Sequence, residues 1–421
     1  MEMRFQALLD DLLAETTRRE PSYFTRFGVA LPESGSAIGR YRVHPLLAAI
    51  PEADLAAAFA AATRYLEAKG VKITTGEGDP LGHVIAFGFL DCLAATYGLL
   101  SLETNHGRLP GMAEILARDY AEKQTPSGVR YYVRRSGSRP LLLVNACGIP
   151  LALWSRFLSD ADHNFRIMVV ERSGQNMLEG GISHPCDLAS DAADIGTALE
   201  HEGGGPVDLL AWCDGGKLAI ELARTKPAVF RKLTLLSAAL RGTARLSQPP
   251  TTYESNFEKV ITTIAQRPAL APMFAKMLGE QLVSTDWDAL ATDAVARAAA
   301  LMRLPAQEYE SAVRVPLSRE LFLLNHARRI QGDATYPLDE RIGALTLPYM
   351  LITGDHDHIA NNTIACAALA GSPARGFHAQ ISGAGHYCFD LQYPYFKLLM
   401  NAFLVEGNRP PSAARLRVEE L

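Results

Sequence analysis

The segment Leu210-Ala-Trp-Cys-Asp-Gly-Gly216 decides the fold of this chain. An apolar strand pattern over Val207 to Ala211 leads into it, and a helical pattern over Lys217 to Thr225 follows it. Its two glycines lack side chains at the point where the strand and the helix have to approach closely. The segment therefore predicts a sharp strand-to-helix turn that carries Cys213.

Short apolar runs alternate with helical stretches from about residue 125 onward. This alternation predicts an α/β fold, a mostly parallel sheet flanked by helices. The expected strands are 129–134 and 140–144, which we expect to form an opening hairpin, followed by 166–170, 207–211, 232–236, 349–353 and 376–381. Helices are expected near 187–202 and over 394–404.

The chain divides into four expected regions. Residues 1–124 form a helical N-terminal region, because their apolar positions recur at helical spacing over 3–19, 53–69, 83–102 and 112–122. Residues 125–240 and 345–421 are the two parts of the sheet core. Residues 241–344 have helical character and are too many for a simple connection, so we expect them to form a helical lid.

The composition argues against several classes of protein. Lys and Arg total 41 against 46 Asp and Glu, the net charge is -5, and no basic run is present, so we expect no nucleic-acid partner. No apolar stretch reaches the ~20 residues that span a bilayer, so we expect no membrane partner. Six scattered cysteines without a C-x-x-C pair predict reduced thiols in a cytoplasmic protein: Cys92, Cys147, Cys186, Cys213, Cys366 and Cys388.

The turn around Cys213 resembles the nucleophile elbow of α/β-hydrolases, G-x-S-x-G. Cys213 stands in place of the serine, and Ala211 stands in place of the first glycine. The resemblance covers about residues 125–405 and implies an α/β-hydrolase fold. In that fold an acid follows a later strand and a histidine follows the last strand, in that order along the chain.

Both partners of the nucleophile have candidates downstream. The segment Tyr349-Met-Leu-Ile-Thr-Gly-Asp-His-Asp-His-Ile359 is a strand that ends in a glycine and two acids. Its offset from the glycine favours Asp357, with Asp355 as the alternative that would otherwise cap the turn. The loop Ser382-Gly-Ala-Gly-His-Tyr387 supplies His386. The expected triad is therefore Cys213, Asp357 and His386.

The same resemblance implies two backbone amides that bind an oxyanion. One is the amide of Asp214, which directly follows the nucleophile. The other comes from the loop Asn145-Ala-Cys-Gly-Ile-Pro150, where position favours Cys147, with Ala146 and Gly148 as alternatives. We expect the thiol of Cys147 to fill space.

His356 and His358 flank the acid and are the strongest metal candidates. No further cysteine or carboxylate stands at ligand spacing from them, so we expect no metal site. We also expect no bound cofactor.

A cysteine nucleophile favours acyl transfer over hydrolysis. Moving an acyl group from a carrier thioester to Cys213 exchanges one thioester for another at nearly constant free energy, and a thiolate is both a strong nucleophile and a good leaving group. The stored acyl group therefore stays activated for a thiol, amine or alcohol.

Two families with cysteine elbows share these motifs. Trp212-Cys-Asp-Gly-Gly216 with Asp357-His-Ile-Ala360 resembles polyhydroxyalkanoate synthases, which polymerise hydroxyacyl-CoA thioesters, although the His386 loop lacks their G-H-I form. The chain is also similar to freestanding aminoacyltransferases of nonribosomal peptide biosynthesis, which carry an aminoacyl group between carrier proteins. Their size, cysteine elbow and helical N-terminal extension match better. This resemblance implies acyl or peptidyl carrier proteins as partners, with the substrate on their phosphopantetheine.

The expected function is a cysteine-dependent acyltransferase that moves an aminoacyl or acyl group between carrier proteins. Alternatives are a thioesterase, a polyhydroxyalkanoate-synthase-like polymerase and a non-catalytic hydrolase-fold binding protein. An aminoacyl substrate needs a carboxylate or backbone carbonyls for its ammonium, and many acids between residues 240 and 345 qualify.

Overall fold

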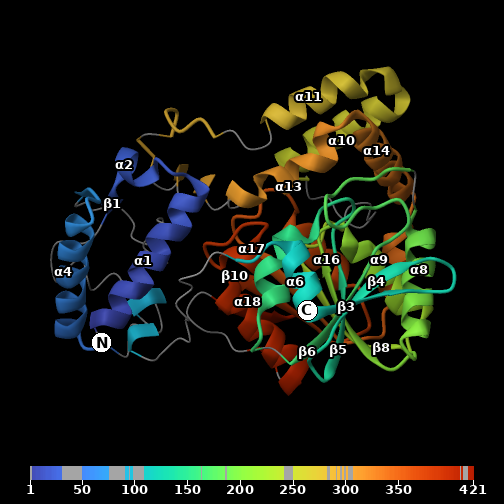
Figure 1. Cartoon of the computed structure of the whole chain (residues 1–421), viewed down its shortest axis with the longest axis horizontal. Coiled ribbons are helices and arrows are strands. Elements are labelled where there is room, and N and C mark those ends of the chain that lie inside the picture. Colours follow the sequence, from blue (N-terminus) through green and yellow to red (C-terminus); the bar gives the residue numbers. More distant parts are fainter. Residues whose placement is uncertain are drawn as a thin grey trace. The chain divides into compact units, whose positions relative to one another are not determined.

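The chain forms two compact units (Figure 1). The computed structural model describes residues 2–30, 50–74, 91–93, 95–97, 109–162, 164–184, 187–240, 250–281, 285–290, 292–293, 296–297, 300–301, 307–407, 409–410 and 416–421. Unit 1 comprises Met1–Arg108, Ser284–Glu308 and Ser412–Leu416, and unit 2 comprises Leu109–Val283, Tyr309–Pro411 and Arg417–Leu421. The sheet-bearing unit thus begins 16 residues before the expected boundary at residue 125.

Unit 1 is built on two helices that the apolar spacing predicts, α1 (Glu2–Arg19) and α4 (Glu52–Ala68). It also holds α2 (Tyr23–Phe27) and a parallel pair of short strands, β1 (Val29–Ala30) and β2 (Ile73–Thr74). Trp287 is buried in its core and meets the Tyr23 ring edge-on at 5.8 Å. Part of the expected lid therefore belongs to this unit. The expected helix over 83–102 lies mostly outside the described residues.

Unit 2 contains a nine-stranded sheet in the order β11-β10-β9-β8-β7-β5-β6-β4-β3. The pairs from β10 to β6 are parallel, whereas β4 is antiparallel to both β6 and β3. The expected mostly parallel sheet is confirmed. The strands are β3 (Tyr120–Gln124), β4 (Arg130–Arg134), β5 (Arg139–Val144), β6 (Phe165–Val170), β7 (Val207–Trp212), β8 (Phe230–Leu236), β9 (Tyr349–Gly354), β10 (Gly376–Ile381) and β11 (Leu416–Glu420).

The first strands pair differently from the expectation. The hairpin predicted between 129–134 and 140–144 does not form, because β5 lies between β6 and β7 while β4 pairs with β3. The helix expected over 112–122 includes residues 120–122, the first part of β3. That helix, α6 (Met112–Asp119), instead ends before β3, whose backbone hydrogen bonds are completed by β4. Pairing with the next strand along the chain outweighs local helical spacing here.

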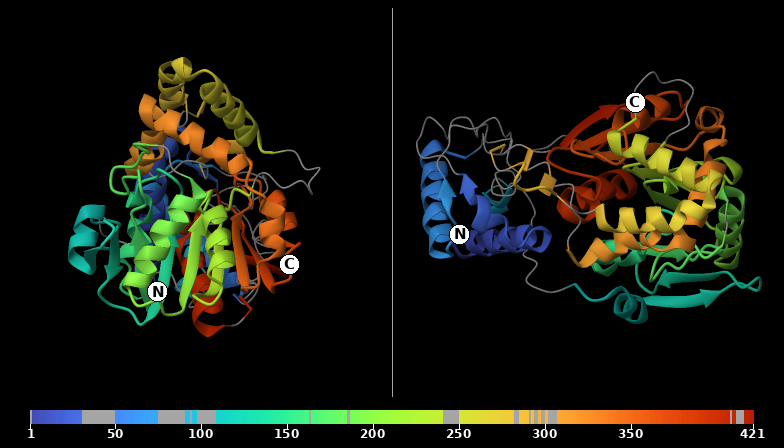
Figure 2. Two further views of the ribbon diagram at one scale, coloured as in Figure 1. Left: turned by 90° about the vertical axis from the view of Figure 1, so that its right-hand side faces the viewer. Right: turned by 90° about the horizontal axis from the view of Figure 1, so that it is seen from above.

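Helices cover both faces of the sheet (Figure 2). The packed side chains of one face come from α8 (Leu188–His201), α9 (Gly215–Thr225), α15 (Leu338–Gly343) and α16 (Asn362–Leu369). The other face carries η3 (Leu151–Trp154), α7 (Ser155–Ser159), α17 (Cys388–Leu391) and α18 (Tyr393–Met400), which continues into the π-helix η5 (Asn401–Glu406). There Trp154 stacks on Phe389 at 4.1 Å between ring centroids.

Four helices that follow β8 pack together around their own apolar cluster, which includes Phe257, Ile261 and Leu323. They are α10 (Thr252–Gln266), α11 (Ala271–Gln281), α13 (Gln307–Ser318) and α14 (Glu320–Ala334). They lie within residues 241–344, for which the sequence predicts a lid, and are called the lid helices below. In the part of the chain that the structure describes, no helix is long and apolar enough to cross a membrane.

Parallel strands carry the predicted site residues to one edge of the sheet. The Cys147 loop follows β5, Cys213 follows β7, Asp357 follows β9 and His386 follows β10. Because these strands all run the same way, their carboxyl ends lie at the same edge. The topology thus gathers residues that are up to 239 positions apart, from Cys147 to His386.

Candidate active site

The turn that carries Cys213 is strained. Its φ of 55° lies in the left-handed region, which non-glycine residues seldom adopt, and such a conformation costs ~1–3 kcal/mol. The Cys213 amide donates to the Leu236 carbonyl (3.0 Å), and the Cys213 carbonyl accepts from the amides of Gly216 and Ala239 (3.1 Å each). These three bonds hold the strained residue between β7 and α9, as the sequence predicts for an elbow.

Gly215 is required by close approach of the neighbouring loop. A Cβ added there would lie 2.8 Å from the Val144 carbonyl oxygen and 2.9 Å from that of Asn145. Neither backbone oxygen can move without shifting the end of β5. The glycine that the sequence singles out therefore lets α9 begin directly against the Cys147 loop.

His386 and Asp357 are brought together as expected. Nδ1 of His386 lies 3.1 Å from Oδ1 and 3.0 Å from Oδ2 of Asp357. The same carboxylate accepts hydrogen bonds at Oδ1 from the amides of Ile359 (2.9 Å) and Ala360 (3.0 Å). Both side chains are almost fully buried, with 2% of His386 and none of Asp357 exposed. The acid is thus fixed by the backbone and in turn orients the imidazole.

The electrostatics of the site favour a charged histidine. Burial by itself lowers the pKa of His386, but the charges of Asp357 and Cys213 and hydrogen bonds to both side chains raise this pKa to about 10. Burial raises the pKa of Asp357, but the His386 charge, its hydrogen bond and the two amides lower it overall. His386 is therefore the group that links the acid to the thiol.

Asp355 has a different role from Asp357. Its Oδ1 accepts from the amides of Gly383 (2.8 Å) and Ala384 (3.3 Å), so it pins the loop that carries His386. That loop packs tightly, since a Cβ at Gly354 would lie 2.2 Å from the Ala384 carbonyl oxygen. Of the two acids left open by the sequence, Asp357 contacts the imidazole and Asp355 holds its loop.

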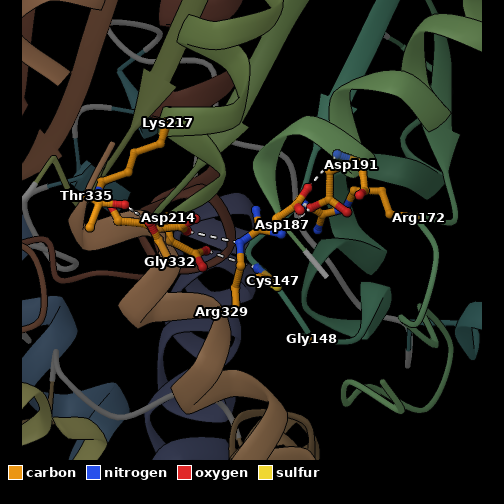
Figure 3. A network of polar contacts seen from close by, with 12 residues as sticks. Cys147, Gly148, Arg172, Asp187, Asp191, Asp214, Lys217, Arg329, Gly332 and Thr335 are labelled. Carbon is orange, nitrogen blue, oxygen red and sulfur yellow. Dashed lines mark hydrogen bonds and ion pairs between the residues drawn. The ribbon is translucent and has the colours of Figure 1, made fainter. Parts of the chain in front are cut away.

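One of the two expected oxyanion amides, that of Cys147, already donates a hydrogen bond, and so does its alternative Gly148. The Cys147 amide donates to Oδ1 of Asp214 at 3.0 Å (Figure 3). The neighbouring alternative, the Gly148 amide, donates to Oε1 of Gln175 at 3.1 Å. The sequence places Cys147 beside the elbow, as observed, but it gives no sign that the side chain of Asp214 occupies its amide. The one available signal was the acidic residue directly after the nucleophile.

A buried network of charges, which sequence reasoning missed, ties the lid helix α14 to this loop (Figure 3). Arg329 of α14 donates to Oδ2 of Asp191 (2.9 Å) and to Oδ2 of Asp333 (3.0 Å). Arg172 donates to the same Asp191 oxygen (3.2 Å) and to the Asn145 carbonyl (3.1 Å). Arg329 is only 4% exposed, so it belongs to the interior of unit 2, whereas its neighbour Arg328 is exposed.

Lys217 joins this network from α9. Its Nζ donates to the carbonyl of Asp333 at 3.4 Å. Burial raises the pKa of the Asp333 carboxyl, and Arg329 and Lys217 oppose that rise, while the charge of Asp214 adds to it. The carboxylate of Asp214 therefore lies close enough to α14 for its charge to raise the pKa of Asp333.

The other cysteines differ from Cys213. Cys147 and Cys388 are buried, and burial raises the pKa of Cys388 and of the half-buried Cys366 to about 12 each. Burial also raises the pKa of Cys92 in unit 1. Cys186 lies outside the described residues. Only Cys213 and Cys366 among the described cysteines are partly exposed, and only Cys213 stands beside an imidazole.

His356 and His358 stand apart from any metal cluster. Nε2 of His356 is 3.9 Å from Oδ1 of Asp355, and the His358 ring meets Tyr253 at 6.2 Å. Among the residues described by the structure, no group of three or more His, Cys, Asp or Glu side chains is placed to hold a metal ion.

Comparisons with known proteins identify the fold family of the chain. A family model for the alpha/beta hydrolase fold matches residues 139–392. The sequence matches none of the curated proteins with which it was compared. Similar solved structures include a bacterial membrane phospholipase A (16% identity, TM-score 0.50, 70% of this chain and 87% of that one) and the epoxide hydrolase CorEH (16%, 0.50, 68% and 98%). A thermophilic esterase from Thermogutta terrifontis is 18% identical, with a TM-score of 0.48 over 68% of this chain and 98% of the other. At 16% identity, the likeness to the phospholipase A and to the epoxide hydrolase shows a shared fold.

Proposed function

Since the chain belongs to the α/β-hydrolase fold family, we propose that it is a cysteine-dependent acyltransferase. It moves an aminoacyl or acyl group between phosphopantetheinyl thioesters of carrier proteins, in nonribosomal peptide or related secondary metabolism. The observation that carries the proposal is the contact of His386 with both Asp357 and Cys213 at a strained elbow. A buried histidine in this position can accept a proton from a thiol and donate a proton to a leaving thiolate.

The reaction proceeds in two halves. The Cys213 thiolate attacks the carbonyl carbon of the loaded carrier, and the bond to the phosphopantetheine sulfur breaks as the bond to Cys213 forms. The departing sulfur takes the proton of the His386 imidazolium. The imidazole then takes the proton of the empty carrier's thiol, which attacks the S-acyl-enzyme and releases Cys213 as thiolate. Asp357 stabilises the imidazolium at the start and end of this cycle.

The oxyanion is assigned to the amides of Asp214 and Cys147. Because the Cys147 amide donates to the Asp214 carboxylate, a substrate carbonyl has to replace that carboxylate oxygen before the amide can serve it. Each such amide typically contributes ~3–4 kcal/mol to the transition state. The proposal needs no resident cofactor, because the phosphopantetheine belongs to the carrier.

The expected compartment follows from the need to keep the Cys213 thiol reduced. A nucleophilic cysteine must stay reduced, so we place the reaction in the cytoplasm, with acyl or peptidyl carrier proteins as partners and no role for nucleic acid or membrane.

A thioesterase is the second candidate. It uses the same acyl-enzyme, with water in place of the second thiol, and hydrolysis is the more general chemistry of the fold family. A polyhydroxyalkanoate-synthase-like polymerase would use a hydroxyacyl chain instead. The three differ only in what attacks the acyl group on Cys213.

The test incubates the protein with a carrier bearing a radiolabelled aminoacyl group and with an empty second carrier. The expected result is label on the second carrier and a matching mass increase on Cys213. C213A should abolish both, and C366A, which removes the other partly exposed described cysteine, should leave both intact. Labelled free acid without transfer would replace the shuttle by the thioesterase, and label on neither product would reject acyl chemistry.

A further inference from the structure

The side chain of Asp214 lies inside the candidate active site. Asp214 directly follows Cys213, and its own backbone amide is one expected oxyanion donor. Its Oδ1 lies 3.0 Å from the amide nitrogen of Cys147, the other expected donor (Figure 3). A carboxylate oxygen thus sits where the carbonyl oxygen of a bound thioester has to accept its hydrogen bond.

Asp214 also differs from the other acids of the network. Asp191 is shared by two arginines, and Asp333 accepts from Arg329. For Asp214, by contrast, no cationic side chain among the described residues forms an ion pair with it, and its contact is the neutral Cys147 amide. Its negative charge is therefore not matched by an ion pair with a described side chain.

A negative charge at this place opposes the reaction of a neutral acyl group. The oxyanion that forms on the acyl carbon would develop a second negative charge beside the carboxylate, and like charges at short range repel strongly in a site partly closed to water. An ammonium on the substrate removes this penalty. In an α-aminoacyl thioester the ammonium is attached to the carbon next to the carbonyl, so it reaches the same place.

We propose that Asp214 selects acyl groups that carry an ammonium beside the thioester carbonyl, and therefore that the donor is an aminoacyl thioester. This inference rests on the proposed function, because it assumes that Cys213 is acylated. The ammonium takes the carboxylate away from the Cys147 amide, and the carbonyl oxygen takes its place. The ammonium acceptor is then the residue after the nucleophile and not an acid of the lid, where the sequence alone left the choice open.

Pantetheine thioesters test the inference without a carrier protein. Three matched pairs differ only in the α-amino group: alanyl and propionyl, valyl and 3-methylbutanoyl, and phenylalanyl and 3-phenylpropanoyl. The rate of S-acylation of Cys213 is followed by intact-protein mass spectrometry. The wild-type protein should prefer the aminoacyl member of at least one pair by about ten- to a hundredfold, as for other charge-assisted contacts.

Variants separate charge recognition from a structural role. D214N keeps the shape and an acceptor for the Cys147 amide but removes the charge, so it should slow aminoacyl donors, speed neutral donors and bring the ratio close to one. D214E keeps the charge and should keep the direction of the preference. D194N is the matched control, because Asp194 likewise accepts from a backbone amide, that of Ser173 at 2.7 Å, and should leave the ratio unchanged.

The outcomes separate the two proposals. A wild-type ratio near one, or an equal slowing of both donors in D214N, would overturn the role of Asp214 and leave carrier-to-carrier transfer intact. A preference for aminoacyl pantetheine in an enzyme that hydrolyses carrier-bound label would retain the role of Asp214 and remove the shuttle. Failure of every thioester to acylate Cys213 would overturn both.

Discussion

The carboxylate of Asp357 lies 3.0 Å from Nδ1 of His386, although the two residues are 29 positions apart in the sequence. Two backbone amides hold one of its oxygens, and no part of the carboxylate reaches solvent. The acid can therefore hold the imidazole in a single orientation toward Cys213.

Replacing this acid should harm the reaction much more than replacing its neighbour. D357N leaves the imidazole in the wrong tautomer and removes the charge that stabilises its protonated form, so we expect acylation of Cys213 to slow by about 10²–10⁴-fold. D355N should slow it far less and lower the melting temperature, because Asp355 pins the His386 loop. Acylation rates and thermal melts of the two variants check this. A larger kinetic loss in D355N would exchange the two roles.

Thiol labelling distinguishes an enzyme from a binding protein with a vestigial triad. Cys213 should react with iodoacetamide at pH 7 at least about tenfold faster than Cys366 or Cys388, whose pKa values burial raises to about 12. Peptide mass spectrometry over a time course measures each rate. H386N should remove the advantage of Cys213. Slow and uniform labelling of all cysteines would favour the binding protein.

The stability of the protein should depend on pH through the buried pair. The pKa of His386 is raised from about 6.5 unfolded to about 10 folded, so its contribution is complete below about pH 6.5 and is lost as the pH rises toward 10. The pKa of Asp357 is lowered, so its contribution is present above its unfolded value near ~4 and is lost as the pH falls below it. The pair thus contributes most between about pH 4 and 6.5.

Urea unfolding at several pH values checks this window. The stability difference between wild type and H386N should shrink from pH 6.5 to pH 10. C213A should move the midpoint of that loss to lower pH, because the charge of Cys213 helps to raise the pKa of His386. A difference that stays constant over this range would contradict the assigned pair.

Arg329 and Arg328 form a matched pair for stability. R329A leaves the buried carboxylates of Asp191 and Asp333 without one of their cations, so we expect a loss of about 3–5 kcal/mol in the free energy of unfolding. R328A removes an exposed side chain and should change it by less than about 0.5 kcal/mol. Chemical denaturation measures both. Equal effects would show that the α14 network does not stabilise unit 2.

Much of the site was predictable because its motifs are local. Few other turns suit a strand that ends in Trp212 and is followed by a cysteine and two glycines. Gly215, two residues after the nucleophile, is needed because a Cβ there would collide with the backbone. The acid loop and the histidine loop each follow a strand that local apolar patterning reveals. The order of these segments then indicated the fold, and the offset from Gly354 favoured Asp357 over Asp355 as the partner of His386.

Other features depend on contacts beyond a single segment. The helical spacing of residues 112–122 runs into β3, which is a strand that pairs with β4. β6 pairs with both β4 and β5 and lies between them, so the turn-like segment that joins β4 to β5 does not make a hairpin. The grouping of residues 284–308 with unit 1 likewise depends on the burial of Trp287 beside Tyr23.

The sequence by itself determined the α/β-hydrolase fold, the elbow at Cys213 and the identity of the acid and histidine candidates, since each rests on short-range patterns of apolar residues and glycines. Only the tertiary structure decided that Asp357 and not Asp355 meets the imidazole, that Arg329 lies buried between two carboxylates, and that the side chain of Asp214 occupies the Cys147 amide. Apart from the pair of Arg329 and Asp333, which lie four residues apart on α14, these contacts join segments 29 to 138 residues apart. Hydrogen bonds and ion pairs are set by distance in space, which no local pattern encodes.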